Sequence, residues 1–118
     1  MGISPKQYHA EVGHGQQKLS IAESEPLAAA DRRVLILETI RGVASQLGLE
    51  AIAAPKPFLD GAGNGHHLHL SIYSREEREP VLFDPSGALS ESGSGFVAGL
   101  LKHLPAIMAF TTPSPNSY

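Results

Sequence analysis

Apolar and polar residues follow regular patterns along most of this 118-residue chain. Residues 7–14 alternate between apolar and polar, which predicts a half-buried strand with His9 and Glu11 on its more polar face. A glycine-rich bend follows, and residues 19–21 resume an extended pattern. The first part of the chain therefore predicts two extended segments joined by a bend.

The spacing of apolar residues predicts one long helix over residues 26–47. Pro26 suits the first helical turn, and Glu23 and Glu25 just before it favour the positive end of the helix dipole. Gly48 ends the helix as its C′ residue. The apolar stripe, at spacings of three and four, consists of Leu27, Ala30, Val34, Leu37, Ile40, Val43, Ala44 and Leu47.

The second part of the chain mixes short strands with helical segments. Short apolar runs predict strands over residues 51–54, 66–74 and 81–83, and the last two favour antiparallel pairing. Residues 89–103 predict a second helix with a serine cap, and residues 104–110 predict a short third helix. The fold class is therefore α+β, an antiparallel sheet with one long helix and a second helical segment.

Composition and charge narrow the function classes. The formal net charge is −3 and no run of Lys or Arg stands out, so we expect no nucleic-acid partner. Cysteine is absent, which excludes a disulfide framework, a thiolate nucleophile and a Cys-based zinc site, and fits a reducing compartment. No apolar run approaches about 18 residues, and the N-terminus has no signal pattern, so we expect a cytoplasmic protein without a membrane partner.

The most informative stretch runs from a glycine-rich turn at residues 61–65 into three histidines. On a strand, His67 and His69 point to one face, with Ser71 next in line. Together with Glu11 these imidazoles suit a divalent cation, and the glycine turn suits a phosphate. Paired strand histidines are also common as surface residues, and glycines as a flexible loop. The spacing by itself leaves both interpretations open.

Five segments, read in order, resemble the catalytic domain of glutamine synthetase. HAEVGHGQ at 9–16 is similar to the strand and turn that carry a metal-ligand glutamate, and PKPF at 55–58 is similar to the family's Pro-Lys-Pro. GNGHHLHLS at 63–71 resembles its Gly-Ser-Gly-Met-His-x-His-x-Ser signature. Residues 89–103 resemble the following helix, and residues 113–118 resemble its Asn-Pro-Thr-x-Asn-Ser-Tyr segment. The resemblance covers almost the whole chain.

The resemblance implies a role for each candidate residue. Glu11 would hold the metal near the glutamate site, and His67 would ligate a second metal that bridges ATP phosphates. His69 would lie on the phosphate side of ATP, and Ser71 near its adenine end. Gly63 would line the glutamate pocket through its backbone. No side chain is assigned as a catalytic nucleophile.

The resemblance also implies the chemistry and the partners. The family uses ATP and Mg²⁺ or Mn²⁺ to phosphorylate the γ-carboxylate of glutamate, and ammonia or another amine then displaces the phosphate. Its active sites form between neighbouring subunits, so we expect a homo-oligomer. Residues 1–118 are then a single partial catalytic domain without the family's N-terminal β-grasp domain, which we expect to be inactive alone. Such a piece should self-associate through apolar residues near its end: Leu104, Ile107, Met108 and Phe110.

Lys18 departs from the family pattern, because it stands where a second glutamate ligand is usual. At about 4 Å and an effective dielectric of about 20, an ammonium repels a dication by roughly 8 kcal/mol. Lys18 therefore either swings out, abolishes this metal site, or pairs with Glu11 and replaces the metal. The alternative function is a non-catalytic pseudoenzyme or oligomerisation module. A small metal hydrolase built on Glu11, His67 and His69 is a third reading, which the motif order disfavours.

Overall fold

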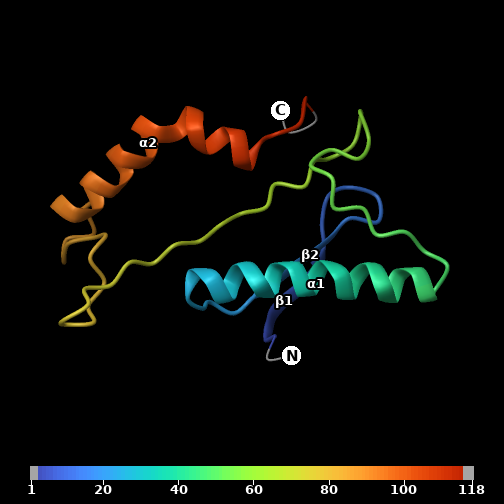
Figure 1. Ribbon diagram of the computed structural model, residues 1–118, viewed down its shortest axis with the longest axis horizontal. Helices are drawn as coiled ribbons and strands as arrows, with labels where there is room; N and C mark the ends of the chain where they lie inside the picture. Colours follow the sequence, from blue (N-terminus) through green and yellow to red (C-terminus); the bar gives the residue numbers. More distant parts are fainter. Residues whose placement is uncertain (1–2, 116–118) are drawn as a thin grey trace. The chain divides into compact units, whose positions relative to one another are not determined.

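The computed structural model describes residues 3–115 and contains both helices and strands (Figure 1). Contacts divide the chain into two units, Met1–Gly65 (unit 1) and His66–Tyr118 (unit 2). The described elements are consistent with the expected α+β class. They are β1 (Pro5–Ala10), β2 (Gln17–Ile21), α1 (Pro26–Gln46) and α2 (Glu91–Thr111).

In unit 1, β1 and β2 pair in antiparallel fashion, with His9 opposite Lys18. The amide of Glu11 donates to the carbonyl of Gln16 (3.0 Å), which closes the turn between the strands, and Gly15 has a φ of +69° that favours glycine there. The strand expected over residues 7–14 is confirmed as far as Ala10 and is wrong beyond it, because the next residues form this turn. Glu11 is therefore the first residue after β1, where the turn begins.

The long helix α1 matches the expectation to within a residue at each end. Pro26 occupies the first turn, and Gly48 follows the helix with a φ of +69°. The amide of Leu49 donates to the carbonyl of Ala44 (2.8 Å) and that of Gly48 to Ser45 (3.1 Å). These two bonds form a Schellman motif, which satisfies carbonyls that the last turn leaves without partners.

In unit 2, α2 is one continuous helix, so the expectation of two helices over residues 89–103 and 104–110 is wrong. Pro105 lies inside the helix. A proline removes its own N–H from the helical ladder and its ring crowds the carbonyl four residues earlier, which weakens the helix locally, and helix-forming residues on both sides continue it. The expected serine cap is Ser90, and its hydroxyl accepts from the amide of Gly93 at 2.9 Å.

The expected strands over residues 51–54, 66–74 and 81–83 are not formed. The structure records only isolated antiparallel bridges, Tyr73 with Pro80 and Phe83 with Leu89. A strand exists through its hydrogen-bonded neighbour, and none of these runs has a paired strand among the described residues. The antiparallel contact expected between the last two runs survives as one hydrogen bond, from the Val81 amide to the Ile72 carbonyl (2.9 Å).

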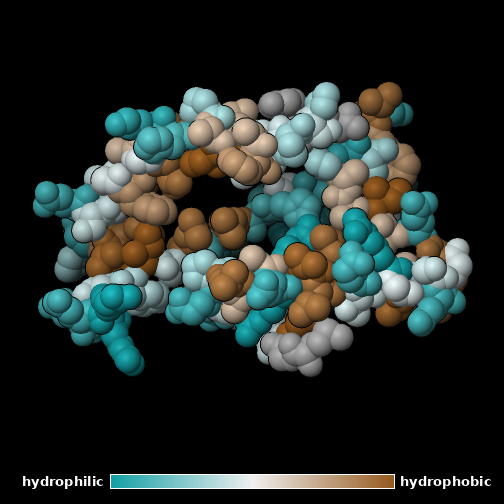
Figure 2. Space-filling model, viewed as in Figure 1, coloured by the Kyte–Doolittle hydropathy of each residue, from teal (hydrophilic) through white to brown (hydrophobic). Residues whose placement is uncertain are grey.

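Among the described residues, no hydrophobic side chain is buried, although the length predicts a modest core. Figure 2 shows apolar side chains, in brown, open on the drawn face. Near the end of α2, Leu104 is 44% exposed and Phe110 88% exposed, while Ile107 and Met108 are partly exposed. The expected apolar surface is present, and its role in self-association stays a prediction.

By length and composition alone, α2 is apolar enough to cross a membrane. This is weak support for a membrane span, because core helices of soluble proteins pass the same test. The helix also carries Lys102 and His103 near its middle, and ionisable residues are costly at the centre of a bilayer.

Candidate functional site

Glu11 is the best-defined candidate side chain in unit 1, and two basic side chains meet it. Its Oε1 lies 3.2 Å from Nε2 of His9 and 3.5 Å from Nζ of Lys18. His9 precedes it by two residues on β1, and Lys18 faces His9 across the hairpin. The hydrogen bond with His9 lowers the pKa of Glu11, and the charge of Lys18 lowers it further. Glu11 is therefore held as a carboxylate.

The Lys18 ion pair bears directly on a metal at Glu11. A carboxylate oxygen is a ligand that Mg²⁺ and Mn²⁺ accept. The Lys18 ammonium, however, already lies beside the same oxygen, and it repels any dication brought there. With Lys18 in this position, the residues present do not fit a divalent cation at Glu11. The pairing that the sequence offered as one alternative is thus observed.

A second feature of unit 1 is a set of hydrogen bonds centred on Gln16. Its Oε1 accepts from the Gly13 amide (2.9 Å), and its Nε2 donates to the Gly63 carbonyl (3.0 Å) and to Oδ1 of Asn64 (2.9 Å). Asn64 in turn donates through Nδ2 to the Ala54 carbonyl (2.7 Å). We call this set the Gln16 clamp. It connects the turn between β1 and β2 (the hairpin turn) to the glycine-rich segment 61–65 (the glycine loop).

The clamp fixes the backbone at Gly63. A Cβ at this position would lie 3.1 Å from the carbonyl oxygen of Pro55, so a side chain would require the backbone to shift. The Asn64 amide also donates to that same carbonyl, at 2.6 Å. The structure thus holds Gly63 in a defined place, and its contact with a substrate stays a prediction.

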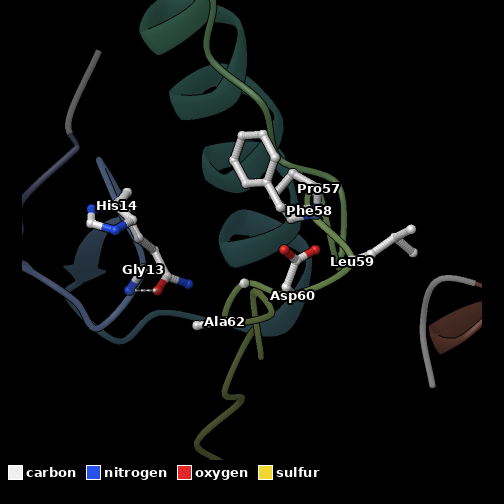
Figure 3. A pocket seen from close by; sticks show the side chains of 9 residues that line it. Gly13, His14, Pro57, Phe58, Leu59, Asp60 and Ala62 are labelled. Carbon is white, nitrogen blue, oxygen red and sulfur yellow. Dashed lines mark hydrogen bonds between the residues drawn. The ribbon is translucent and has the colours of Figure 1, made fainter.

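Between the hairpin turn and the glycine loop lies a pocket of about 640 Å³ (Figure 3). One wall is the hairpin turn, and the other is the segment 57–62. In Figure 3 the Asp60 carboxylate rises from the loop beneath the Phe58 ring, and Leu59 points away. The lining residues are Gly13, His14, Gln16, Pro57, Phe58, Leu59, Asp60, Gly61 and Ala62.

The remaining candidates belong to unit 2. His67, His69 and Ser71 are exposed and lie on a stretch without regular structure. The shared face expected for the two imidazoles requires a strand, and that strand is not formed here. In the described part of the chain, no three His, Asp or Glu side chains gather into a group able to hold a metal ion. The metal and ATP roles of these residues stay predictions.

Sequence reasoning gave little weight to three side chains that the structure makes prominent. Asn64 and Asp60 were not singled out, and Gln16 entered only as the last residue of the segment HAEVGHGQ. Gln16 and Asn64 owe their roles to contacts between segments 47 or 48 residues apart, which no local pattern reveals. A weak signal was available, since Asn64 is a polar residue between two glycines and could bond the loop around it.

Comparisons with known proteins place these features in a family. The family model described as "Glutamine synthetase, catalytic domain" matches residues 1–118. The chain is 40% identical over 120 residues to a gamma-glutamylpolyamine synthetase of Streptomyces coelicolor, a match over 98% of this chain and 25% of that protein. It is 38% identical over 117 residues to a glutamine synthetase of Pyrococcus horikoshii, over 99% of this chain and 26% of that protein. The chain thus spans about a quarter of the length of these relatives.

Proposed function

Because the chain belongs to the glutamine synthetase family through its catalytic domain, we propose that it is part of an ATP-dependent ligase. The reaction joins glutamate to ammonia or another amine by way of γ-glutamyl phosphate. The observation that carries this proposal is the family match over the whole of residues 1–118, together with relatives named as glutamine and gamma-glutamylpolyamine synthetases. The proposal implies a cytoplasmic homo-oligomer, and an isolated quarter-length piece that does not turn over.

In this proposal the side chains keep the roles that the family resemblance implies. His67 is a metal ligand, and Glu11 becomes one only once the Lys18 ammonium moves away from its carboxylate. His69 and Ser71 contact ATP, and Gly63 contacts glutamate. Mg²⁺ or Mn²⁺, when bound, would neutralise charge on the phosphoryl group. The chain's own contribution to glutamate binding is the Gln16 clamp, which holds the Gly63 backbone in one conformation.

The second candidate function is a non-catalytic member of the family that keeps the scaffold. One observation favours it: the Lys18 ammonium occupies the neighbourhood of the Glu11 carboxylate, where a dication would need to bind. In that case the ion pair stabilises the hairpin, and metal binding at Glu11 is lost. The same chain would then serve in assembly rather than in turnover.

The test is a calorimetric titration with Mn²⁺ and with ATP, together with ligase turnover in the full chain that carries these residues. The ligase proposal requires binding of both and ATP consumption that depends on glutamate and an amine. His67→Ala should weaken metal binding, whereas His103→Ala on α2 is the matched control. A folded protein that binds neither Mn²⁺ nor ATP would count against the ligase.

Lys18→Glu separates the two candidates. It removes the ammonium and supplies a second carboxylate beside Glu11, so we expect Mn²⁺ affinity to rise by at least about tenfold. If the unchanged protein is inactive and Lys18→Glu produces turnover, the lysine had converted the protein into a non-catalytic form. If neither affinity nor turnover rises, Lys18 does not limit this site.

A further inference from the structure

We infer that Asn64 is a modification site, at which the side-chain amide is lost by spontaneous deamidation, and that the Gln16 clamp controls the rate of this loss. Asn64 is followed directly by Gly65 in the glycine loop. Asparagine is among the thermally labile residues, and a following glycine places no side chain in the way of its reaction. The reaction needs no ligand, metal or partner, so it is independent of the proposed function.

The reaction joins the side chain of Asn64 to the backbone that follows it. The amide nitrogen of Gly65, after losing its proton, attacks Cγ of Asn64 and closes a succinimide ring. The bond from Cγ to Nδ2 breaks, and this nitrogen takes up a proton and leaves as ammonia. Water then opens the ring at one of its carbonyls, which yields aspartate or isoaspartate at position 64. Solvent water is therefore the only co-reactant.

The attacking nitrogen has no partner that would restrain it. The Gly65 amide makes no hydrogen bond with any residue in the described range 3–115, and Gly65 is exposed. Glycine also lacks the Cβ that would crowd the approach of Cγ. The contacts of the nucleophile therefore do not limit the reaction.

The side-chain amide of Asn64, in contrast, is held at both of its ends. Its Oδ1 accepts from Nε2 of Gln16 at 2.9 Å, and its Nδ2 donates to the Ala54 carbonyl at 2.7 Å. The backbone amide of Asn64 donates to the adjacent Pro55 carbonyl at 2.6 Å. Ring closure needs the side chain to turn and Nδ2 to depart, and both motions break these bonds. Deamidation therefore proceeds from the state in which the clamp is open.

The hydrogen bond from Gln16 to Oδ1 has two opposing effects on the reaction. It restrains the side chain, and a donor at this oxygen can also stabilise the negative charge that develops there during attack. That stabilisation is large only where the donor is aimed at the oxygen in the transition state. Here the donor is aimed at the oxygen of the resting side chain, and the turn of Cγ withdraws that oxygen from it. Restraint therefore outweighs activation.

Deamidation would open the clamp irreversibly. Aspartate at position 64 has an oxygen in place of Nδ2, and this oxygen has no proton to donate to the Ala54 carbonyl. Isoaspartate also adds a methylene group to the backbone next to Gly63, whose carbonyl Gln16 holds. The glycine loop thus loses its connection to the hairpin turn.

The test follows the peptide that contains residue 64 by mass spectrometry, in the full chain incubated at neutral to mildly basic pH. Replacement of NH₂ by OH raises the mass of this peptide. We expect slow conversion in the unchanged protein and a rate at least about tenfold higher in Gln16→Leu. Gln16→Glu, which keeps the shape of the side chain and loses the donor, should raise the rate as well. Gln17→Leu, at the exposed neighbouring position of β2, should convert at the unchanged rate.

A further variant tests the identity of the nucleophile. Gly65→Ala combined with Gln16→Leu should cancel most of the gain, because a Cβ crowds the attacking nitrogen. Hydrogen exchange at the Asn64 amide in Gln16→Leu should rise by the same factor as the deamidation rate, since both proceed from the open loop. Helical circular dichroism equal to that of the unchanged protein shows that a faster rate does not come from global unfolding.

Three results would overturn the inference. The first is an equal rate in Gln16→Leu and Gln17→Leu, and the second is no conversion at Asn64 in any variant. The third is a slower rate in both variants of Gln16, which would mean that its hydrogen bond activates the amide. Asn116, the other asparagine of the sequence, is followed by serine and gives an internal reference rate in the same digests.

Discussion

In unit 1 the side chain of Gln16 reaches a loop 47 residues further along the chain, whereas in unit 2 the side chain of Ser90 reaches back nine residues to the Val81 carbonyl. Both contacts end in a backbone carbonyl, and both fix a glycine nearby. They differ in how much chain they connect. The first holds two distant segments at a candidate site, and the second caps a helix beside its own entry loop.

The candidate site residues also differ between the two units in the contacts that hold them. Side chains of unit 1 hold both Glu11 and Gly63: His9 and Lys18 contact the Glu11 carboxylate, and Gln16 donates to the Gly63 carbonyl. The histidine stretch of unit 2 lies outside both the cap and any strand. The chemistry at Glu11 is therefore defined by contacts within this chain, while that of the histidines depends on a strand partner that the described residues do not provide.

The largest effect should come from Gly93→Ala in the cap of α2. The added Cβ would lie 2.0 Å from the carbonyl oxygen of Leu82, which is far inside contact distance. We expect a loss of about 3 kcal/mol in the stability of α2, because the helix start must move away from this carbonyl. Urea titration followed by helical circular dichroism measures it.

Gly95→Ala is the matched control for that change. Its Cβ would meet nothing within 4 Å, and alanine is the better helix former, so we expect a gain of up to about 1 kcal/mol. Equal effects of the two substitutions would mean that the entry loop does not pack against Gly93. The local packing that the comparison assigns to the cap of α2 in unit 2 would then be absent.

Gln16→Leu tests the long-range contact of unit 1. It leaves the Gly63 carbonyl and the Gly13 amide without their partner, and we expect the glycine loop to open more easily by about 2 kcal/mol. Hydrogen exchange at the Asn64 amide reports this opening, because that amide donates to the Pro55 carbonyl. Gln17→Leu, at an exposed neighbouring position of β2, should leave the exchange rate unchanged. An unchanged exchange rate of the Asn64 amide in both variants would show that the Gln16 clamp does not stabilise the glycine loop.

Ser90→Ala should have a smaller effect than either. It removes the hydroxyl that accepts from the Gly93 amide, and loss of a serine cap costs about 1 kcal/mol. Ser92→Ala, one residue inside the helix and exposed, serves as the control. The helix melting temperature should fall for the first variant only. A fall of the same size for both would assign the effect to helix propensity rather than to capping.

Local contacts explain which parts of the fold could be predicted from the sequence. The helix α1 was predicted because its apolar spacing, Pro26 and Gly48 act within a few residues of one another. The cap of α2 was among the expected candidates for the same reason. The break expected near Pro105 was wrong, because a proline rule weighs one residue and not the helix formers on either side.

Longer-range contacts explain what could not be predicted. The strand expected over residues 66–74 has the right composition but no paired neighbour, and composition does not supply one. The Gln16 clamp joins segments that share no pattern. At the candidate site, the pairing of Lys18 with Glu11 was one of three alternatives that the sequence left open, whereas Asp60 emerged only from the arrangement of a pocket.

The smallest effect concerns the turn at Asp84, whose hydrogen bonds span two to four residues. Its Oδ1 accepts from the Ser86 hydroxyl (2.6 Å), from the Ser86 amide (2.8 Å) and from the Ala88 amide (3.1 Å). The Ser86 side chain, together with these amides, lowers the pKa of Asp84 from its ordinary value of 3.8. A lowered folded pKa stabilises the turn above pH 3.8, and this stability is lost as the pH falls through the folded pKa.

Ser86→Ala should raise the pKa of Asp84 toward its ordinary value, as measured by NMR titration of its side-chain carbon. Ser92→Ala should leave that titration unchanged. The titration in Ser90→Ala sharpens the comparison further, because every partner of Asp84 lies within four residues of it. We expect the lowered pKa to persist there even though the helix cap is lost. A pKa that rises in Ser90→Ala would show that the turn and the cap form one cooperative unit.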